Sequence, residues 1–519
     1  MRGKKLVSIS FIIITITLLS RILGFVREET IAYFFGTTFV SDAMKIATYI
    51  PFTISHLLVA GILSAVFIPV FTDFLVEKKE DEMWEVFNTL FNTIVIIFLI
   101  LSVIFFIFSR QVVYMMAPHA SEDMLKLATL MFKILIPQML ILGIATLFTG
   151  LHNTYESFTI PAIGGFLYNF GVVILLIIGV PLFGPMAIVY GALFGSIAQL
   201  LIQLPFVIKK GWRYKFILNL KNPYVKKIGL LSIPILINST FAYITPIFEK
   251  SIGSSFGEGA ISSLDYAYKV SQLPLGLFAL AIALVIYPTL SQLVARKEID
   301  RLGRTLNFGL RFILYLMLPS ALGLILLSFP IIRLLFQQGE FTVNSSKTVS
   351  MLLSFYSIGL PFWGMTALLN RAFYSFKDTT TPVIISLITI FIQISLYFIN
   401  SRILGLKGIP LAASIAAIVQ FVLLYIFIKK KVTTLSILDF IKRFLYILIY
   451  SVIMSSLALY ASNYFEKNGF TLTKKGQIIQ VFSAIVISLL VYFVLIYIRD
   501  YKDLKKELKN IRGGIDRNE

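Results

Sequence analysis

The sequence contains no cysteine and only three histidines, His56, His119 and His152. The chain therefore has no disulfide, no thiolate nucleophile and no thiolate metal ligand, and its scattered histidines form no cluster that could hold a metal. No stretch of the form G-x-x-x-x-G-K-[ST] occurs, so there is no phosphate-cradling loop for ATP hydrolysis. We expect no metal, no cofactor and no enzymatic activity.

Charge is also scarce. Asp, Glu, Lys and Arg make up 14% of the 519 residues and hydrophobic residues 58%, whereas soluble proteins carry about 25% charged residues. Apolar runs of about 20 residues, such as 478–498, match the thickness of the hydrocarbon core of a bilayer. Because a helix satisfies its own backbone polar groups in lipid, these runs predict an all-α polytopic membrane protein.

Hydropathy predicts about fourteen transmembrane helices, and the first of them is interpreted as a retained span rather than a cleaved signal peptide. They lie near residues 6–37, 40–76, 84–108, 123–151, 158–180, 185–209, 224–253, 260–293, 302–329, 345–375, 380–400, 407–428, 437–463 and 475–499. The net charge of +20 falls mostly in alternate loops, so it indicates membrane topology and not nucleic-acid binding. This pattern predicts a cytoplasmic N-terminus and C-terminus, although Lys474 and Lys475 lie in a predicted outer loop.

The chain contains an internal repeat. Asp42 and Pro51 have the same spacing as Asp265 and Pro274, which lie 223 residues further on. Three further pairs repeat at offsets of 219 to 224 residues: 67–69 with 286–288, Pro137 with Pro361, and Pro161 with Pro382. Two such units with an even number of spans form a parallel repeat, which is typical of transporters that open alternately to each side.

The repeat predicts two six-helix lobes and two additional C-terminal helices. The N-terminal lobe covers residues 1–218 and the C-terminal lobe residues 224–430. The two extra helices cover 437–499, and a basic cytoplasmic tail covers 500–519. A duplicated pair of lobes predicts a substrate site near the middle of the bilayer.

Ionisable residues inside predicted spans are candidates for substrate binding, since each costs at least about 2.5–3.5 kcal/mol at membrane depth. The candidates are Arg21, Arg27, Glu28, Asp42, Lys45, His56 and Lys269.

Each of these candidates also has a structural explanation. Arg21 could pair with Glu28, seven residues away on the same helical face, or with Asp42. Arg27 could extend to the outer interface, and His56 could be a buried structural histidine. Lys269 has its repeat counterpart beside Lys45, so both lobes place a cation at equivalent depth. A group of Arg and Lys residues favours an anionic, phosphate-bearing substrate.

The residues Ser20-Arg-Ile-Leu-Gly-Phe-Val-Arg-Glu28, Gly36, Ser41-Asp-Ala43 and the run from Gly61 to Pro69 resemble the MurJ (MviN) lipid II flippases of the multidrug/oligosaccharidyl-lipid/polysaccharide (MOP) exporter superfamily. The resemblance extends through all fourteen predicted spans. It implies a fold of two six-helix lobes plus two helices whose groove holds a polyprenyl tail.

The resemblance also implies roles for residues of this sequence. Arg21 and Arg27 match two arginines that line a cationic cavity for the lipid II pyrophosphate, and Glu28 and Asp42 match the family's acidic positions. Two positions depart from the family pattern. Ser55-His56 replaces a usual arginine, and Lys269 replaces another, which keeps the charge but loses the bidentate fork.

The function implied is movement of undecaprenyl-pyrophosphate-linked peptidoglycan precursor from the cytoplasmic to the periplasmic leaflet of the bacterial inner membrane. Expected partners are lipid II or a similar lipid-linked anionic glycan, membrane lipids and cell-wall synthesis proteins. The alternatives are a flippase for another polyprenyl-linked glycan and, less favoured, a MOP-superfamily drug exporter, which would need an acidic or aromatic cavity. A membrane glycosyltransferase would need larger outer loops, and a scaffold would not explain the buried cations.

The alternating basic loops generate a topology prediction. Reporters at Trp212, Lys297 and Lys430 should be cytoplasmic, and a reporter at Gln338 should be periplasmic. Accessibility in intact and permeabilised cells measures this. A cytoplasmic reporter at Gln338 would contradict the fourteen-span arrangement.

Overall fold

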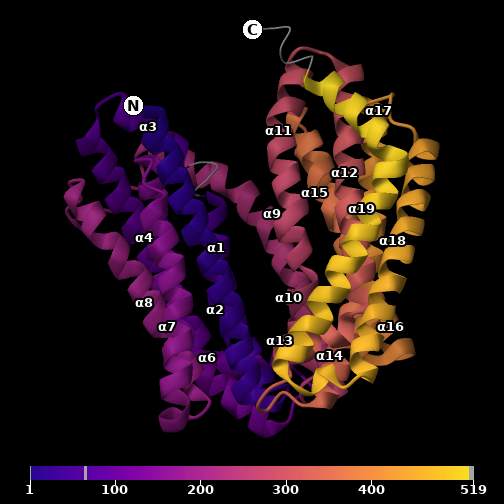
Figure 1. Ribbon diagram of the computed structural model, residues 1–519. Coiled ribbons are helices and arrows are strands. Elements are labelled where there is room, and N and C mark those ends of the chain that lie inside the picture. Colours follow the sequence, from indigo (N-terminus) through magenta and orange to yellow (C-terminus); the bar gives the residue numbers. More distant parts are fainter. Residues whose placement is uncertain (1, 63–66, 513–519) are drawn as a thin grey trace. The chain divides into compact units, whose positions relative to one another are not determined.

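The computed structural model describes residues 2–62 and 67–512, and all regular structure among them is helical (Figure 1). The predicted all-α membrane fold is confirmed. Nine helical segments among the described residues are long and apolar enough to cross a membrane, or ten when α14 and α15, bent by 42°, count as one span. The predicted count of fourteen is not confirmed. The nine include 380–431 as one segment, although its two helices turn back on each other at Gly405.

The chain divides into two compact units, residues 1–262 with 338–341, and residues 263–337 with 342–519. In unit 1, α1 packs against α7, and α2 packs against α6 and α9. Its helices are α1 (Arg2–Phe35), α2 (Phe39–Ile62), α3 (Ile68–Val76), α4 (Glu80–Ile107), α5 (Ser109–Met116), α6 (Glu122–Thr154), α7 (Thr159–Phe183), α8 (Met186–Lys209) and α9 (Pro223–Gly253).

Unit 2 contains the remaining helices, apart from the first residues of α10, which group with unit 1. They are α10 (Ala260–Ser271), a π-helical turn (Leu275–Ala279), α11 (Leu280–Ala295), α12 (Ile299–Leu326), α13 (Ser328–Phe336), α14 (Val343–Ser357), α15 (Leu360–Ser375), α16 (Thr380–Leu404), α17 (Gly408–Lys431), α18 (Ile437–Lys467) and α19 (Lys474–Arg512). The C-terminal pair α18–α19 is attached to this unit, since α18 packs on α12 and Tyr492 Oη donates to the Tyr315 carbonyl over 2.8 Å.

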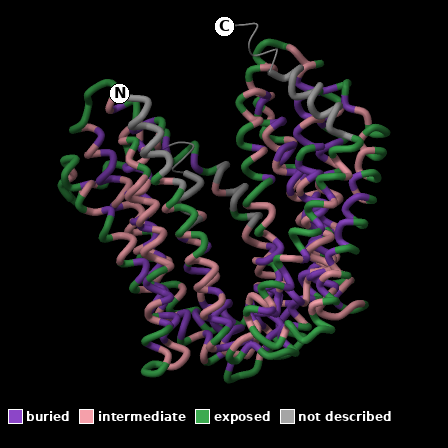
Figure 2. Tube along the Cα trace, viewed as in Figure 1, coloured by how far each residue is buried: buried purple, intermediate pink, exposed green. Residues whose placement is uncertain are grey.

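The sequence marks many helix starts locally. The side chains of Ser121, Asn222, Thr342 and Ser436 each accept a hydrogen bond from a backbone N–H of the helix that follows. Such caps satisfy amides that have no partner within the helix. Along the helices of each unit, buried and exposed residues alternate, as expected of helices that pack on one side and face lipid on the other (Figure 2).

Left-handed backbone positions recur at the repeat offset. Four pairs with positive φ lie 219 to 223 residues apart: Gly36 and Gly259, Lys78 and Lys297, Glu156 and Lys377, Gly184 and Gly405. Because non-glycine residues adopt positive φ rarely, matched turns at these positions support the internal repeat. The lobes 1–218 and 224–430 stay predictions, and α9 groups with unit 1 by its contacts.

A short segment between α13 and α14 belongs to unit 1. The Glu340 amide donates to the Tyr33 carbonyl over 2.9 Å, and Gln338 Nε2 donates to Glu29 Oε1 over 3.0 Å. A Cβ built on Gly36 would lie 2.3 Å from the Glu340 carbonyl oxygen, so this close approach requires glycine. Residues 338–341 therefore cover the C-terminal end of α1.

Candidate functional site

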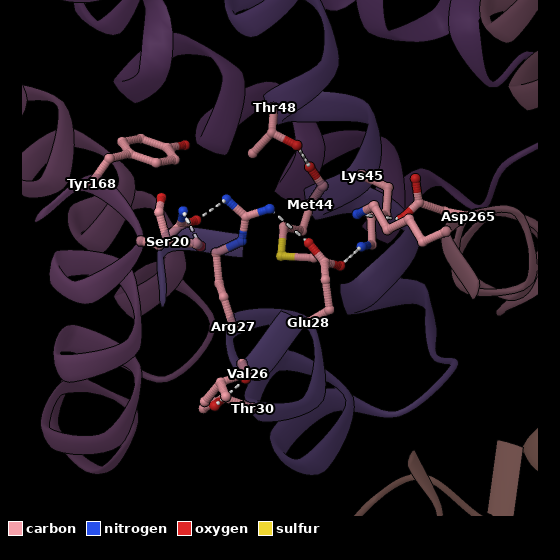
Figure 3. Close-up of polar contacts among 12 residues, drawn as sticks. Ser20, Val26, Arg27, Glu28, Thr30, Met44, Lys45, Thr48, Tyr168 and Asp265 are labelled. Atoms are coloured by element: carbon pink, nitrogen blue, oxygen red, sulfur yellow. Dashed lines mark hydrogen bonds and ion pairs between the residues drawn. The ribbon is translucent and has the colours of Figure 1, made fainter. Parts of the chain in front are cut away.

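Three charged candidates meet where α1 packs beside α2. Arg27 Nη2 donates to Glu28 Oε1 over 2.8 Å, and Lys45 Nζ donates to Glu28 Oε2 over 2.6 Å. Figure 3 shows the Glu28 carboxylate between the two cations. The group formed by Arg27, Glu28 and Lys45, here called the α1–α2 charge cluster, carries one negative and two positive charges.

Exposure differs within the charge cluster. The side chains of Glu28 and Lys45 are 7% and 6% exposed, whereas that of Arg27 is 24% exposed. Buried ions need partners, because an uncompensated charge in an apolar surrounding is costly. Lys45 neutralises Glu28 from the buried side, and Arg27 adds a positive charge on the more accessible side. The cluster therefore presents a guanidinium that can contact an anion.

Asn169 on α7 holds Arg27 in place. Its Oδ1 accepts a hydrogen bond from Arg27 Nη1 over 3.1 Å, and its Nδ2 donates to the carbonyls of Ser20 and Gly165 over 3.3 and 3.2 Å. The Arg27 guanidinium carbon also lies 5.9 Å from the centre of the Tyr168 ring. Sequence reasoning missed Asn169. The feature of the sequence that could have identified Asn169 is its polar amide side chain in the middle of the predicted apolar span 158–180.

Arg21 is exposed on α1, and among the described residues its side chain has no hydrogen bond or ion pair. The alternative of an Arg21–Glu28 pair is wrong, since Arg21 forms no ion pair among the described residues and the Glu28 carboxylate is bound by Arg27 and Lys45 instead. At the membrane depth that the sequence predicts for Arg21, a guanidinium would be too costly to leave in hydrocarbon. Arg21 therefore has to face water or a polar ligand.

Asp42 is brought to the start of α10 and not to the charge cluster. Its carboxylate oxygens accept hydrogen bonds from the backbone amides of Gly259 and Ser262, both over 2.7 Å, and the residue is 1% exposed. A carboxylate at this position satisfies amides at the helix N-terminus and interacts favourably with the helix dipole. The alternative of an Arg21–Asp42 pair is also wrong, because Arg21 forms no ion pair within the described part of the chain and the Asp42 carboxylate binds the two amides instead.

The other two candidates are Lys269 and His56. Lys269 Nζ lies 2.8 Å from Asp265 Oδ2, one turn away on α10, and the Lys269 side chain is 36% exposed. His56 falls in α2, but its side chain lies outside the described residues.

Lys250 on α9 was not predicted. It is 6% exposed, and its Nζ lies 5.1 Å from the centre of the Tyr49 ring, one turn beyond Lys45 on α2. The cation–π contact stabilises a desolvated ammonium. Its signal in the sequence was a lysine inside the predicted span 224–253. Unit 1 thus carries a further buried cation on the helix that packs against α2.

Comparisons with known proteins agree with one another. The family model "Lipid II flippase MurJ" matches residues 31–479. A probable lipid II flippase MurJ of Rickettsia prowazekii is 30% identical over 80% of this chain and 82% of its own. A lipid II flippase MurJ of Burkholderia cenocepacia is 26% identical over 94% of this chain and 96% of its own.

Solved structures show the same relationship. A lipid II flippase MurJ in an inward closed conformation has a TM-score of 0.80 and 28% identity, covering 95% of this chain and 99% of its own. An inward-facing multidrug resistance MATE family transporter of the MOP superfamily has a TM-score of 0.68 at 14% identity, covering 82% and 98%, and shows the fold alone. The matched family range begins after Arg21, Arg27 and Glu28, so the roles of these residues depend on the local geometry.

The shared carboxylate generates a stability prediction. Glu28→Gln should destabilise the protein by about 3–5 kcal/mol, because it removes the carboxylate that Lys45 and Arg27 share. Arg27→Gln should cost much less, since the buried Glu28–Lys45 pair survives. Thermal unfolding of the purified variants in detergent measures the difference.

The control is the double variant Glu28→Gln/Lys45→Met, which removes the buried pair as a unit and should recover much of the lost stability. Equal unfolding temperatures for Glu28→Gln and Arg27→Gln would contradict the assignment of Glu28 as the shared counter-ion.

Proposed function

The chain belongs to the lipid II flippase MurJ family, and from this premise we propose that it moves lipid II from the cytoplasmic to the periplasmic leaflet of the bacterial inner membrane. It is a multi-pass membrane protein of a transporter family. The observation that carries the proposal is the net positive charge of the α1–α2 charge cluster, with Arg21 on the same helix as Arg27. Arg27 extends from a cluster whose only carboxylate is already paired, and Arg21 is exposed without an ion pair among the described residues.

This arrangement suits a pyrophosphate. Guanidinium groups bind phosphate oxygens through two parallel hydrogen bonds, and such charge-assisted bonds are about twice as strong as neutral ones. Arg27 and Arg21 are six residues apart, so their Cα atoms are separated by about 9 Å along the helix. The two residues are also about 120° apart around the helix axis, so their long side chains would have to turn toward each other to hold two linked phosphates. Asn169 binds both the Arg27 guanidinium and the Ser20 carbonyl, so it orders the turns that carry the two arginines.

The remaining candidates have distinct proposed roles. Lys45 and Glu28 hold Arg27 in position, and Asp42 organises the start of α10. Lys269 supplies a further cation for the substrate. It pairs with Asp265 on its own helix, and an anionic substrate would compete with that carboxylate. His56 remains a proposed substrate contact.

The proposal extends to the remaining regions. The lobes 1–218 and 224–430 would alternate in opening to the two leaflets, with both termini cytoplasmic, and the helices of 437–499 would bind the polyprenyl tail. Apolar side chains on α18 and α19 such as Ile449, Phe482 and Leu490 are exposed, which suits contact with an isoprenoid chain. Movement would be driven without ATP hydrolysis by this chain.

Specific observations bear on two alternative functions, export of an organic cation and movement of another lipid-linked glycan. Export of an organic cation is disfavoured, because the charge cluster has a net positive charge. Another polyprenyl-pyrophosphate glycan would use the same arginines, and Ser55-His56 stands where the resemblance implies an arginine. A lipid II flippase and a flippase for another polyprenyl-pyrophosphate glycan would therefore differ in the sugar headgroup that they accept.

A complementation experiment tests the proposal. In a bacterium depleted of its own lipid II flippase, the wild-type chain should restore growth, whereas Arg21→Ala and Arg27→Ala should fail at normal membrane levels. Lys269→Arg should keep or improve function because it restores a bidentate donor. The matched control is Arg110→Ala, which removes a cation whose side chain is 69% exposed and paired with Glu122.

Membrane levels are measured by immunoblot for every variant. Growth supported by Arg21→Ala, or loss of growth explained entirely by lost protein, would contradict the assignment. Failure of the wild-type chain alongside export of a different lipid-linked glycan would favour the alternative substrate.

A further inference from the structure

The segment between α8 and α9 is extended and held by side chains of α4. Residues 212–220, here called the strap, contain no helix or strand. Asn88 Nδ2 donates to the Arg213 carbonyl over 3.1 Å, and Asn88 Oδ1 accepts from the Lys215 amide over 3.2 Å. Asn92 Nδ2 donates to the carbonyls of Lys215 and Ile217, both over 3.0 Å.

These contacts fix the backbone of the strap. Asn88 and Asn92 are each 2% exposed, so their amides are committed to the strap and not to water. The Trp212 indole donates to Asn88 Oδ1 over 3.1 Å and packs against the Phe91 and Phe148 rings, with centroids 5.5 and 5.3 Å away. An extended segment fixed this way holds its side chains in defined directions.

The fixed strap displays apolar side chains. Tyr214, Phe216, Leu218 and Leu220 are 58%, 70%, 42% and 54% exposed. They alternate in sequence with Arg213, Lys215 and Ile217.

Successive side chains of an extended chain point to opposite sides. By this alternation Phe216, Leu218 and Leu220 fall on one side of the strap together with Tyr214, whose ring also lies 5.9 Å from the Phe91 ring. Arg213 and Lys215 fall on the other side together with Ile217. Displaying four large apolar side chains to water would be costly, so this side needs a covering surface.

The charge around the strap identifies the kind of surface. Residues 209–227 contain seven basic side chains and no Asp or Glu. They are Lys209, Lys210, Arg213, Lys215, Lys221, Lys226 and Lys227. Basic side chains near an anionic membrane surface are attracted to it, and several close together add up. Interleaved aromatic side chains are typical of the membrane–water interface.

The position along α4 supports the same conclusion. Exposed apolar side chains on this helix include Ile97, Leu99 and Ile100, whereas its first turn carries Glu80, Asp81 and Glu82. Asn92 precedes Ile97 by five residues, or about 7.5 Å along the helix. The strap therefore lies along α4 between its charged first turn and its exposed apolar surface, as expected of a segment at the level of the lipid headgroups.

We infer that the strap binds the anionic phospholipid surface of the leaflet next to the α8–α9 connection. Tyr214, Phe216, Leu218 and Leu220 enter the boundary between headgroups and acyl chains, while Arg213, Lys215 and the flanking lysines contact headgroup phosphates. The inference is independent of the transported substrate, since it concerns the outer surface of unit 1.

Site-directed spin labelling tests this inference in the full-length protein. The chain has no cysteine, so Phe216→Cys and Lys79→Cys each introduce one labelling site. Lys79, 49% exposed at the start of α4, is the aqueous control. In nanodiscs containing phosphatidylglycerol, the label at position 216 should be accessible to oxygen and shielded from an aqueous nickel reagent, whereas the label at position 79 should show the reverse.

The role of charge is tested in nanodiscs of phosphatidylcholine alone. The label at position 216 should lie deeper with phosphatidylglycerol than without it, and Arg213→Gln/Lys215→Gln should reduce that difference. Equal nickel access at positions 216 and 79 would overturn the inference, and would instead favour an acidic protein partner as the cover of the strap. If the label at position 216 lies equally deep with and without phosphatidylglycerol, the proposed contacts of the basic side chains with headgroup phosphates are wrong.

Discussion

The Glu28 carboxylate, shared between Arg27 and Lys45, is the interaction on which the proposed site depends. Inside a membrane protein, a single charge requires a partner, and two cations on one carboxylate leave one positive charge in excess. The more exposed Arg27 carries that excess toward a region where an anion can reach it. The same pairing that makes the charges tolerable therefore also creates an anion-binding surface.

Neighbouring contacts make this surface rigid. Asn169 on α7 fixes the Arg27 guanidinium and the backbone near Arg21. A phosphate-binding group held in advance loses less side-chain entropy on binding. Asn169 does not need to contact the substrate to influence its binding.

Much of the fold could be predicted from the sequence, because long apolar runs leave helices as the only solution in lipid. The partners in the site could not. Helical spacing pairs Glu28 with Arg21, but the long side chains of Arg27 and Lys45 reach the carboxylate from a neighbouring position and from another helix. Asn169 acts only through the packing of α7 on α1, which a single sequence does not encode locally.

The most direct test of the central claim is the affinity of the purified protein for undecaprenyl pyrophosphate compared with undecaprenol, which lacks phosphate. The account predicts tighter binding of the pyrophosphate by the wild type. Arg21→Gln/Arg27→Gln should lose more than about tenfold of that preference, since each charge-assisted hydrogen bond contributes about 1.5–3 kcal/mol. Equal affinities of the wild type for the two lipids, or an undiminished preference in the double variant, would contradict it.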